Sequence, residues 1–249
     1  MPKSTAASIK VNWIFCMEST KNIVVTISIL IGTVFFFGLS GADIWVQSHF
    51  YNSLTHQWIV NTNNEILKFI FYDGIKRLLI IVAVLMLFGS IAVWKRPFFK
   101  AYRRGIVIVL LSSVLVPVVV GSLKAVTNMP CPKNIEIFGG AYPHTCVWEK
   151  YNTQECHLEK QKCWPAGHAS GGFALLALVF LFHSRKAKIA AASTAMIIGW
   201  GMGTYKMVIG DHFLSHTVIT MILAWLIILL IVRGVDKFIE MRIRRKEGV

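Results

Sequence analysis

The chain has 249 residues, of which 55% are hydrophobic and 15% are charged, and its formal net charge is +14. Soluble domains carry about 25% charged residues, so this composition indicates a membrane protein and excludes an ordinary soluble domain. The positive charge alone suggests nucleic acid as a partner, but the basic residues lie in short segments beside apolar runs, where they contact lipid headgroups instead.

Six apolar runs are candidates for membrane-spanning helices, since about 20 apolar residues cross a bilayer core. They cover roughly residues 22–41, 75–94, 105–123, 169–182, 189–209 and 213–232. The fourth run is short, so we expect that helix to begin in a region lined by protein. No small-residue cleavage site follows the first run, so we expect it to be retained as an anchor. The sequence therefore predicts one all-α domain over residues 1–249, a polytopic six-helix bundle.

Basic residues mark every second connection of this bundle. They precede the first run, crowd the connections after the second and the fourth, and follow the sixth. Cytoplasmic loops are rich in lysine and arginine, so we expect both termini in the cytoplasm. The segments 42–74 and 125–167 then lie on the opposite face. A bacterial inner membrane with that face in the periplasm fits best, and a eukaryotic organelle is the alternative.

The first exported segment, residues 42–74, alternates aromatic residues such as Phe50, Trp58 and Tyr72 with polar ones. This pattern predicts one or two amphipathic helices in the headgroup layer. Two roles fit such helices. The first is a structural collar around the bundle, which the pattern favours, and the second is a lid over a substrate.

The second exported segment, residues 125–167, is rich in proline and glycine, which break long helices. Four cysteines lie in it, namely Cys131, Cys146, Cys156 and Cys163. Four cysteines in one exported loop suggest two disulfides that hold a compact cap, with three pairings open. A zinc site is the alternative, but the segment lacks the CxxC spacing of zinc knuckles. The fifth cysteine, Cys16, is expected to be a free cytoplasmic thiol.

Ionisable residues gather at the exported ends of the predicted helices, and such residues near lipid are usually functional. They are Lys124, His168, Lys206, Asp211, His212 and His216. In one bundle they converge on a single rim, where two lysines and the helix N-terminus at Gly167 suit a phosphate. One neutral imidazole can attack phosphorus while a protonated one donates to the leaving oxygen. A phosphohistidine would then be hydrolysed by water.

These residues resemble the type 2 phosphatidic acid phosphatase superfamily, integral-membrane lipid phosphatases of six helices that need no metal. Its signatures are a lysine followed after six residues by Arg-Pro, then Pro-Ser-Gly-His, then Ser-Arg, five residues, His, three residues and Asp. The matching stretches are "KAVTNMPCP" from Lys124, "PAGH" from Pro165 and "YKMVIGDHFLSH" from Tyr205. Order and spacing agree in all three stretches.

The chain departs from the signatures at several positions. Cys131 stands where arginine belongs, Ala166 replaces serine, Tyr205 and Lys206 replace Ser-Arg, and His216 replaces aspartate. A cysteine held in a disulfide cannot replace the bidentate phosphate clamp of an arginine. Ala166 lacks the serine hydroxyl but keeps its backbone amide.

Two of these departures, at Cys131 and His216, remove a charged residue whose function another side chain would have to perform. Lys133, His144 or another loop cation could stand in for the arginine, and the sequence does not choose among them. Four residues after His212, His216 lies on the same helical face and can accept its hydrogen bond, without the negative charge of aspartate. Asp211 is a poorer substitute, and we expect it to cap the sixth helix.

The resemblance implies a lipid phosphatase without metal or cofactor. It assigns attack on phosphorus to His212, protonation of the leaving oxygen to His168, orientation of His212 to His216, and phosphate binding to Lys124, Lys206 and the Gly167 amide. Lipid A is favoured as the substrate, with phosphatidylglycerophosphate, undecaprenyl pyrophosphate and phosphatidic acid as alternatives. Phosphate transfer to a second lipid, or a binding or transport protein without turnover, are alternatives for the function. The sequence does not predict the oligomeric state.

Overall fold

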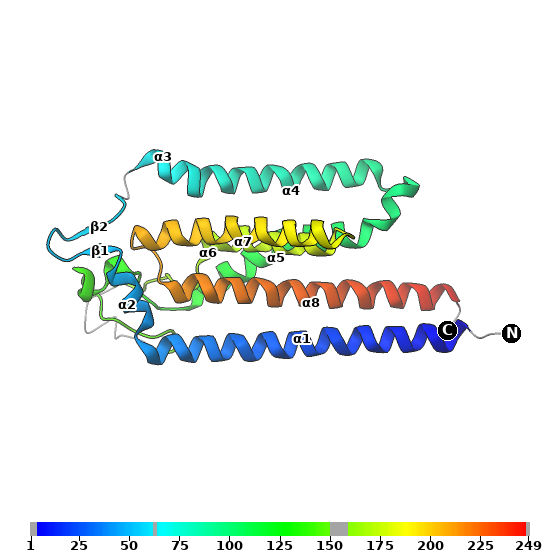
Figure 1. Cartoon of the computed structure of the whole chain (residues 1–249), viewed down its shortest axis with the longest axis horizontal. Coiled ribbons are helices and arrows are strands. Elements are labelled where there is room, and N and C mark those ends of the chain that lie inside the picture. Colours follow the sequence, from blue (N-terminus) through cyan, green and yellow to red (C-terminus); the bar gives the residue numbers. More distant parts are fainter. Residues whose placement is uncertain (1–3, 62–63, 150–158, 248–249) are drawn as a thin grey trace.

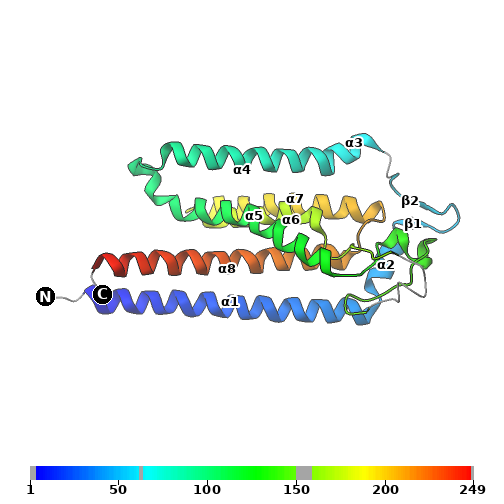
Figure 2. The ribbon, with the colours of Figure 1, turned by 180° about the vertical axis from the view of Figure 1, so that it is seen from behind.

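The computed structural model describes residues 4–61, 64–149 and 159–247, and it confirms the all-α prediction. Long helices lie side by side along the molecule (Figures 1 and 2). They are α1 (Ser4–Ser40), α4 (Gly74–Val93), α5 (Arg103–Val126), α7 (Arg185–Val208) and α8 (Leu214–Glu247). A short helix, α6 (Gly167–Ala174), continues into the 3₁₀ helix Leu175–Phe180 and packs against α5, α7 and α8.

Within the described ranges, four helices are long and apolar enough to cross a membrane. They are Thr20–Ser40, Glu65–Val93, Arg103–Val126 and Leu214–Arg245, which makes the chain a multi-pass membrane protein. The fourth and fifth predicted spans are helical but do not belong to this group. The helix Gly167–Phe180 is shorter, and α7 has 24 residues that include many small and polar side chains. The number of six spans therefore stays a prediction.

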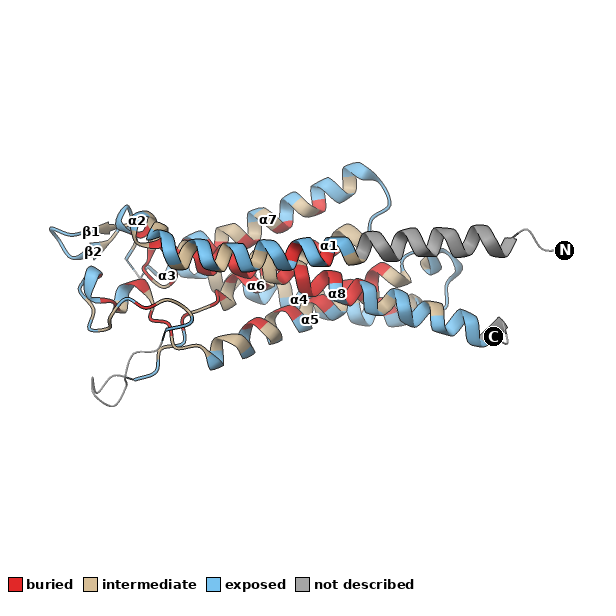
Figure 3. Ribbon diagram, turned by 90° about the horizontal axis from the view of Figure 1, so that it is seen from below, coloured by how far each residue is buried: buried red, intermediate tan, exposed pale blue. Residues whose placement is uncertain are grey.

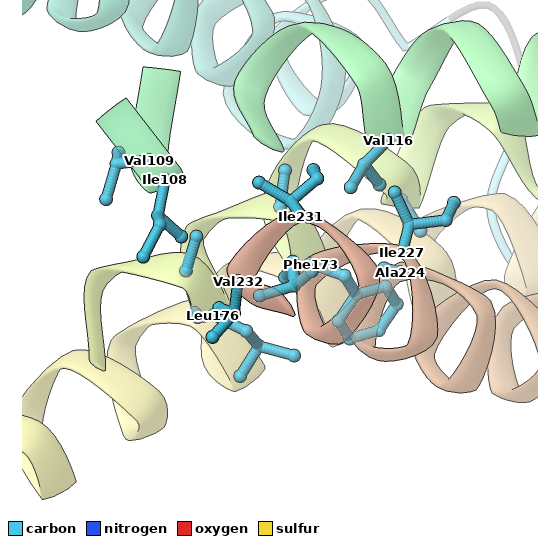
Figure 4. Close-up of a cluster of buried hydrophobic side chains, with 14 of the residues drawn as sticks. Ile108, Val109, Val116, Phe173, Leu176, Ala224, Ile227, Ile231 and Val232 are labelled. Atoms are coloured by element: carbon cyan, nitrogen blue, oxygen red, sulfur yellow. The ribbon is translucent and has the colours of Figure 1, made fainter. Parts of the chain in front are cut away.

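Helix α8 is the central helix of the bundle. It packs against α1, α5 and α6. Half of its most apolar 18-residue stretch is buried inside the protein, compared with 6% of the corresponding stretch in the helix Glu65–Val93. Side chains from α5, α6 and α8, such as Val116, Phe173 and Ile227, interdigitate in the core (Figure 4). Buried residues follow the middle of the molecule (Figure 3), while apolar side chains of the outer helices α1 and α4 are exposed. Exposed apolar faces of this kind suit contact with lipid.

Helices α6 and α7 approach each other closely through glycine. A Cβ atom on Gly172 would lie 2.7 Å from the Cα of Gly199, and one on Gly199 would lie 2.4 Å from the Phe173 ring. The sequence around Gly199, "GWGMG", therefore packs a helix against its neighbour, as small residues do in membrane bundles. The close approach draws the start of α6, which carries His168, against α7.

The first exported segment differs from its prediction in its middle part. It contains the helix α2 (Ala42–Ser48), the antiparallel strands β1 (Tyr51–Asn52) and β2 (Gln57–Trp58), the short helix α3 (Glu65–Lys68) and a π-helical turn, Phe69–Asp73. The Asn52 side chain accepts hydrogen bonds from the N–H groups of Leu54 and Thr55, and His56 has a φ of 53°. This local turn chemistry closes a hairpin where amphipathicity alone predicted a helix.

The second exported segment has no long helix within its described part, residues 125–149 and 159–167. It forms 3₁₀ turns at Pro132–Asn134 and Glu136–Phe138, and a disulfide joins Cys131 to Cys163. One predicted disulfide is thus confirmed. Cys146 carries a free thiol, while Cys156 and the side chain of Cys16 lie outside the described residues, so the second disulfide stays a prediction.

The two segments predicted to be exported gather at the end of the bundle that also holds the α7–α8 turn (Figure 1). The two chain termini lie at the opposite end, together with the connection between α4 and α5 (Figure 2). This arrangement places the basic segments at one end of the molecule and the predicted site residues near the other.

Candidate active site

The turn between α7 and α8 presents His212. Helix α7 ends where the N–H groups of Asp211 and His212 both donate to the carbonyl oxygen of Lys206, at 2.8 and 3.1 Å. Gly210 adopts a φ of +75°, and a Cβ there would meet the Trp58 ring at 2.4 Å, so only glycine fits this position. The tight turn sets His212 directly above the first turn of α8.

Three imidazoles come together at this turn. The ring centroids of His168 and His212 are 5.7 Å apart, and the Nδ1 atoms of His212 and His216 are 3.2 Å apart. The hydrogen bond predicted between positions i and i+4 is therefore confirmed. His212 is 2% exposed and His216 is fully buried. The Nε2 atom of His212 is buried without a hydrogen-bond partner in the described part of the chain.

The surroundings of His212 strongly favour its neutral form. Burial is the main reason why its pKa lies well below the ordinary value. The imidazoles of His216 and His168 and the ammonium groups of Lys124 and Lys206 lower this pKa further. A neutral imidazole has a free ring nitrogen, which a nucleophile requires.

The two predicted phosphate-binding lysines reach the site from α5 and α7. A Cβ atom on Gly167 would lie 3.8 Å from the Cδ of Lys124, so the stem of this lysine lies along the start of α6. Gly167 is the first residue of α6, where backbone N–H groups have no partner within the helix. The Nζ atom of Lys206 lies 2.8 Å from a carboxylate oxygen of Asp211.

Asp211 does not cap α8, so that expectation is wrong. Its two carboxylate oxygens instead each lie 2.8 Å from an ammonium group, that of Lys133 and that of Lys206. Burial by itself raises the pKa of Asp211, but the hydrogen bonds and charges of the two lysines outweigh burial and hold this pKa below its ordinary value. Asp211 is therefore a carboxylate held between two cations beside His212.

The cap on α8 comes from the short helix α2. The Oδ1 atom of Asp43 accepts a hydrogen bond of 2.8 Å from the N–H of Ser215, in the first turn of α8. The Nε2 atom of Gln47 donates to the carbonyl oxygen of Met207, near the end of α7, at 2.7 Å. Neither residue belongs to a motif, and both are far from the turn in sequence, so sequence reasoning missed them.

Tyr72 is a third residue that sequence reasoning did not assign to the site. Its ring meets the ring of His168 edge to face, with centroids 4.5 Å apart, and the Nζ of Lys206 lies 4.8 Å from its centroid. The contact with the ammonium group is a cation–π interaction. The only sequence feature that could have indicated this role is that Tyr72 is one of the aromatic residues in the segment 42–74, which is predicted to be exported. The segment predicted as a collar thus contributes a side chain to the site.

The disulfide packs directly against the histidines. The sulfur of Cys163 lies 3.6 Å from Nδ1 of His212, and the N–H of Ala166 donates to the carbonyl oxygen of His216 at 3.3 Å. The Ala166 amide is thus used within the protein rather than directed at a ligand. Cys163, His212 and His216 place potential metal-ligating atoms within 4.8 Å of one another, but a disulfide sulfur is not a thiolate, which is the form that binds metals.

Comparison with known proteins agrees with this geometry. The PAP2 superfamily model matches residues 105–240, more than half of the chain. The chain is also 29% identical over 198 residues to a lipid A 4'-phosphatase from Francisella tularensis subsp. novicida (strain U112), covering 74% of this chain and 82% of that protein. No solved structure matches the chain. Because the family match spans all three signature stretches, and His168 and His212 from two of them lie with ring centroids 5.7 Å apart, the chain belongs to the PAP2 superfamily. It is a membrane-bound lipid phosphatase, a phosphoric monoester hydrolase.

Proposed function

We propose that the enzyme removes a phosphate from lipid A at the periplasmic face of a bacterial inner membrane, through a phosphohistidine at His212. The activity printed for the relative from Francisella supports lipid A as the substrate. The basic segments at the end of the bundle opposite His212 support the orientation, because lysine and arginine favour the cytoplasm. The observation that carries the mechanism is the 5.7 Å separation between the rings of His168 and His212.

The first step forms a bond between Nε2 of His212 and phosphorus and breaks the bond between phosphorus and the lipid oxygen. The Nδ1 contact with His216 supports this assignment, because it leaves Nε2 as the nitrogen without a partner. When Nδ1–H of His212 donates to His216, Nε2 keeps its lone pair for attack. His216 thus orients the nucleophile and selects its tautomer.

Burial and the charges of Lys206 and Lys124 lower the pKa of His168 to about 4 in the free enzyme, so we propose that His168 takes up its proton when the phosphate dianion binds. His168 then donates this proton to the leaving lipid oxygen in the first step and is left neutral. In the second step a water molecule attacks phosphorus, its proton passes to His168, and the bond to His212 breaks with return of the electron pair to Nε2. Inorganic phosphate leaves and His168 is protonated again. Rings 5.7 Å apart can both contact a single phosphate, since each hydrogen bond to it spans about 2.7–3.2 Å.

Lys124, Lys206 and the Gly167 amide hold the phosphate in this proposal. The lysines stabilise the charge that spreads over the phosphoryl oxygens in the transition state. The amide at the start of α6 adds a donor where the helix dipole favours an anion. The Lys124 side chain, whose Cδ would lie 3.8 Å from a Cβ on Gly167, supports a common binding place for the two groups.

Phosphate release from purified lipids tests the proposal. The protein in detergent micelles is given lipid A, phosphatidylglycerophosphate, undecaprenyl pyrophosphate or phosphatidic acid, one at a time and with a chelator present. We expect the fastest release from lipid A, no effect of the chelator, and release from His212→Ala lowered to background. Full activity of His212→Ala would contradict the mechanism, and a faster release from another lipid would contradict the substrate.

Rapid quenching of the reaction with ³²P-labelled lipid A tests the covalent step. We expect a protein-bound label that survives alkali and is lost in acid, as phosphohistidine is, and that is absent from His212→Ala. Release of phosphate only when a second lipid is present would show a phosphotransferase instead of a hydrolase. The exposed His49→Ala variant, which lies in α2–β1 and outside the site, serves as the matched control and should keep full activity.

A further inference from the structure

The family arginine in the first signature has no direct substitute in this chain. Cys131 stands at its position and is bonded to Cys163, so it offers no positive charge. A phosphate site that lacks this arginine loses one cation and two donors. The residue two positions later, Lys133, lies in the 3₁₀ turn Pro132–Asn134 and brings an ammonium group to the same part of the molecule.

The backbone holds Lys133 against the turn that carries His212. Its N–H donates to the carbonyl oxygen of Gly210 at 2.9 Å, so the 3₁₀ turn is joined directly to the α7–α8 turn. From there its Nζ reaches Oδ1 of Asp211 at 2.8 Å. The side chain of Lys133 is 43% exposed, so it is accessible from outside while its ammonium group contacts Asp211.

Asp211 then lies between two lysines that approach from different elements. Lys133 contacts one oxygen of the carboxylate, and Lys206, whose side chain is 12% exposed, contacts the other. Lys206 also lies over the ring of Tyr72, which meets His168. The ammonium groups of Lys133 and Lys206 therefore converge on the Asp211 carboxylate. Asp211 directly precedes the proposed nucleophile His212, and Lys206 connects it through Tyr72 to His168.

We propose that Lys133 is a further phosphate-binding residue and that the Asp211 carboxylate is an internal competitor, which the substrate's phosphate monoester displaces from Lys133 and Lys206. This inference rests on the proposed function of the His212 site. A phosphate monoester offers three oxygens and a charge of about −1.5 to −2 at pH 7, compared with two oxygens and a charge of −1 on the carboxylate. The phosphate is therefore the stronger partner for two ammonium groups.

Displacement of Asp211 requires little reorganisation. The ion pair between Lys133 and Asp211 is partly exposed, and such pairs contribute little to stability. Asp211 is 20% exposed, so its carboxylate has solvent to turn towards when the lysines change partner. The same two cations serve the free enzyme and the complex, and only their anion changes.

Opposite effects of two substitutions on phosphate affinity test the inference. Binding of inorganic phosphate is measured by thermal stabilisation of the full-length protein in detergent, and as inhibition of phosphate release from lipid A. Lys133→Ala should weaken phosphate binding and raise KM by about 5- to 20-fold, because a charged hydrogen bond is lost. Asp211→Asn should strengthen phosphate binding by about 3- to 10-fold, because the competing charge is removed.

Controls separate this role from a structural one. If the Lys133–Asp211 pair only stabilised the loop, both substitutions would lower the thermal midpoint and neither would strengthen phosphate binding, and that result would overturn the inference. Lys162→Ala, an exposed lysine of the same loop, should change nothing. Lys133→Arg should keep phosphate binding at or above the wild-type level, which decides the matter if Asp211→Asn does not fold.

The outcome is separable from that of the proposed function. Wild-type protein that releases no phosphate from any lipid, yet binds inorganic phosphate with the predicted opposite effects, contradicts the proposed reaction and supports the Lys133 site. Wild-type protein that is active on lipid A, with a Lys133→Ala variant of unchanged KM and phosphate affinity, supports the reaction and overturns the Lys133 site.

Discussion

The carboxylate of Asp43 accepts a hydrogen bond from the backbone N–H of Ser215, which lies 172 residues further along the chain. Ser215 lies between His212 and His216, so a side chain of α2 satisfies an N–H at the start of α8 beside both histidines. Gln47, one turn further along α2, bonds the end of α7. Helix α2 therefore holds both ends of the turn that presents His212.

Replacement of Asp43 should show this role. Asp43→Ala removes the acceptor for the Ser215 N–H and should lower stability by about 1–2 kcal/mol and reduce kcat more than it raises KM. Asp43→Asn keeps an oxygen at the same place and should retain kcat and at least the wild-type stability. The thermal midpoint in detergent and the kinetics of lipid A dephosphorylation measure these effects. Equal behaviour of the alanine and asparagine variants would speak against a capping role.

The same carboxyl group should give the protein a measurable pH dependence. Burial raises the pKa of Asp43 to about 6 from its ordinary value of 3.8, and the hydrogen bonds with Ser215 lower it only in part. Between these values the folded protein binds the proton more tightly than the unfolded chain. The contribution of Asp43 to the free energy of unfolding should therefore be largest below about pH 4. It should fall as pH rises to about 6, by up to about 1.4 kcal/mol per pH unit.

Asp43→Asn isolates this pH effect, because asparagine does not titrate. The difference in thermal midpoint between wild type and variant, followed from pH 4 to pH 7, should move in favour of the variant as pH rises. A difference that stays constant over this range would mean that Asp43 does not titrate there.

His216 should act through the tautomer and charge of His212. His216→Ala leaves Nδ1 of His212 without its partner at 3.2 Å and should lower kcat by about 10²- to 10⁴-fold. His216→Asp supplies the carboxylate of the family signature, which stabilises a positively charged His212 and should raise its pKa. The acid limb of the pH–kcat profile should then move to higher pH. An unshifted profile in an active His216→Asp variant would contradict this coupling.

The disulfide between Cys131 and Cys163 should support both stability and activity, because its sulfur contacts His212. With a sequence separation of 32 between the two cysteines, the chain-entropy model gives a stabilisation of about 3–4 kcal/mol. The Cys131→Ser/Cys163→Ser double variant should melt earlier, lose activity and no longer respond to a reductant. Cys146→Ser should lose activity and stability in a reductant as the wild type does. If the double variant is still as sensitive to the reductant as the wild type, that sensitivity belongs to other cysteines.

The glycine contact between α6 and α7 should be sensitive to a single methyl group. Gly172→Ala places a carbon 2.7 Å from the backbone of Gly199, so the helices must separate, at a cost of about 1–3 kcal/mol. Because α6 carries His168, kcat should fall as well. Gly201→Ala is the matched control, since a Cβ there meets no heavy atom within 4 Å. Equal melting of the two variants would argue against close packing at this point.

The sequence by itself determined the features that depend on neighbouring residues. Apolar run length and the position of basic residues predicted a helical membrane protein, because both act through local contact with lipid and headgroups. The four-residue spacing predicted the contact between His212 and His216, although only His216 lies in α8 and the preceding turn positions His212. Local turn chemistry was the exception, since the hairpin after α2 depends on the Asn52 side chain, which hydrophobic patterning does not register.

Only the tertiary structure decided which distant residues meet at the site. The cap from Asp43, the ring of Tyr72 against His168, and the choice of Lys133 over His144 as the cation beside Asp211 have no signal in spacing or periodicity. The pairing of Cys131 with Cys163 was one of three that the sequence allowed. Such contacts follow from how whole helices pack, and packing depends on the fit of many side chains at once, as the approach of Gly172 to Gly199 illustrates.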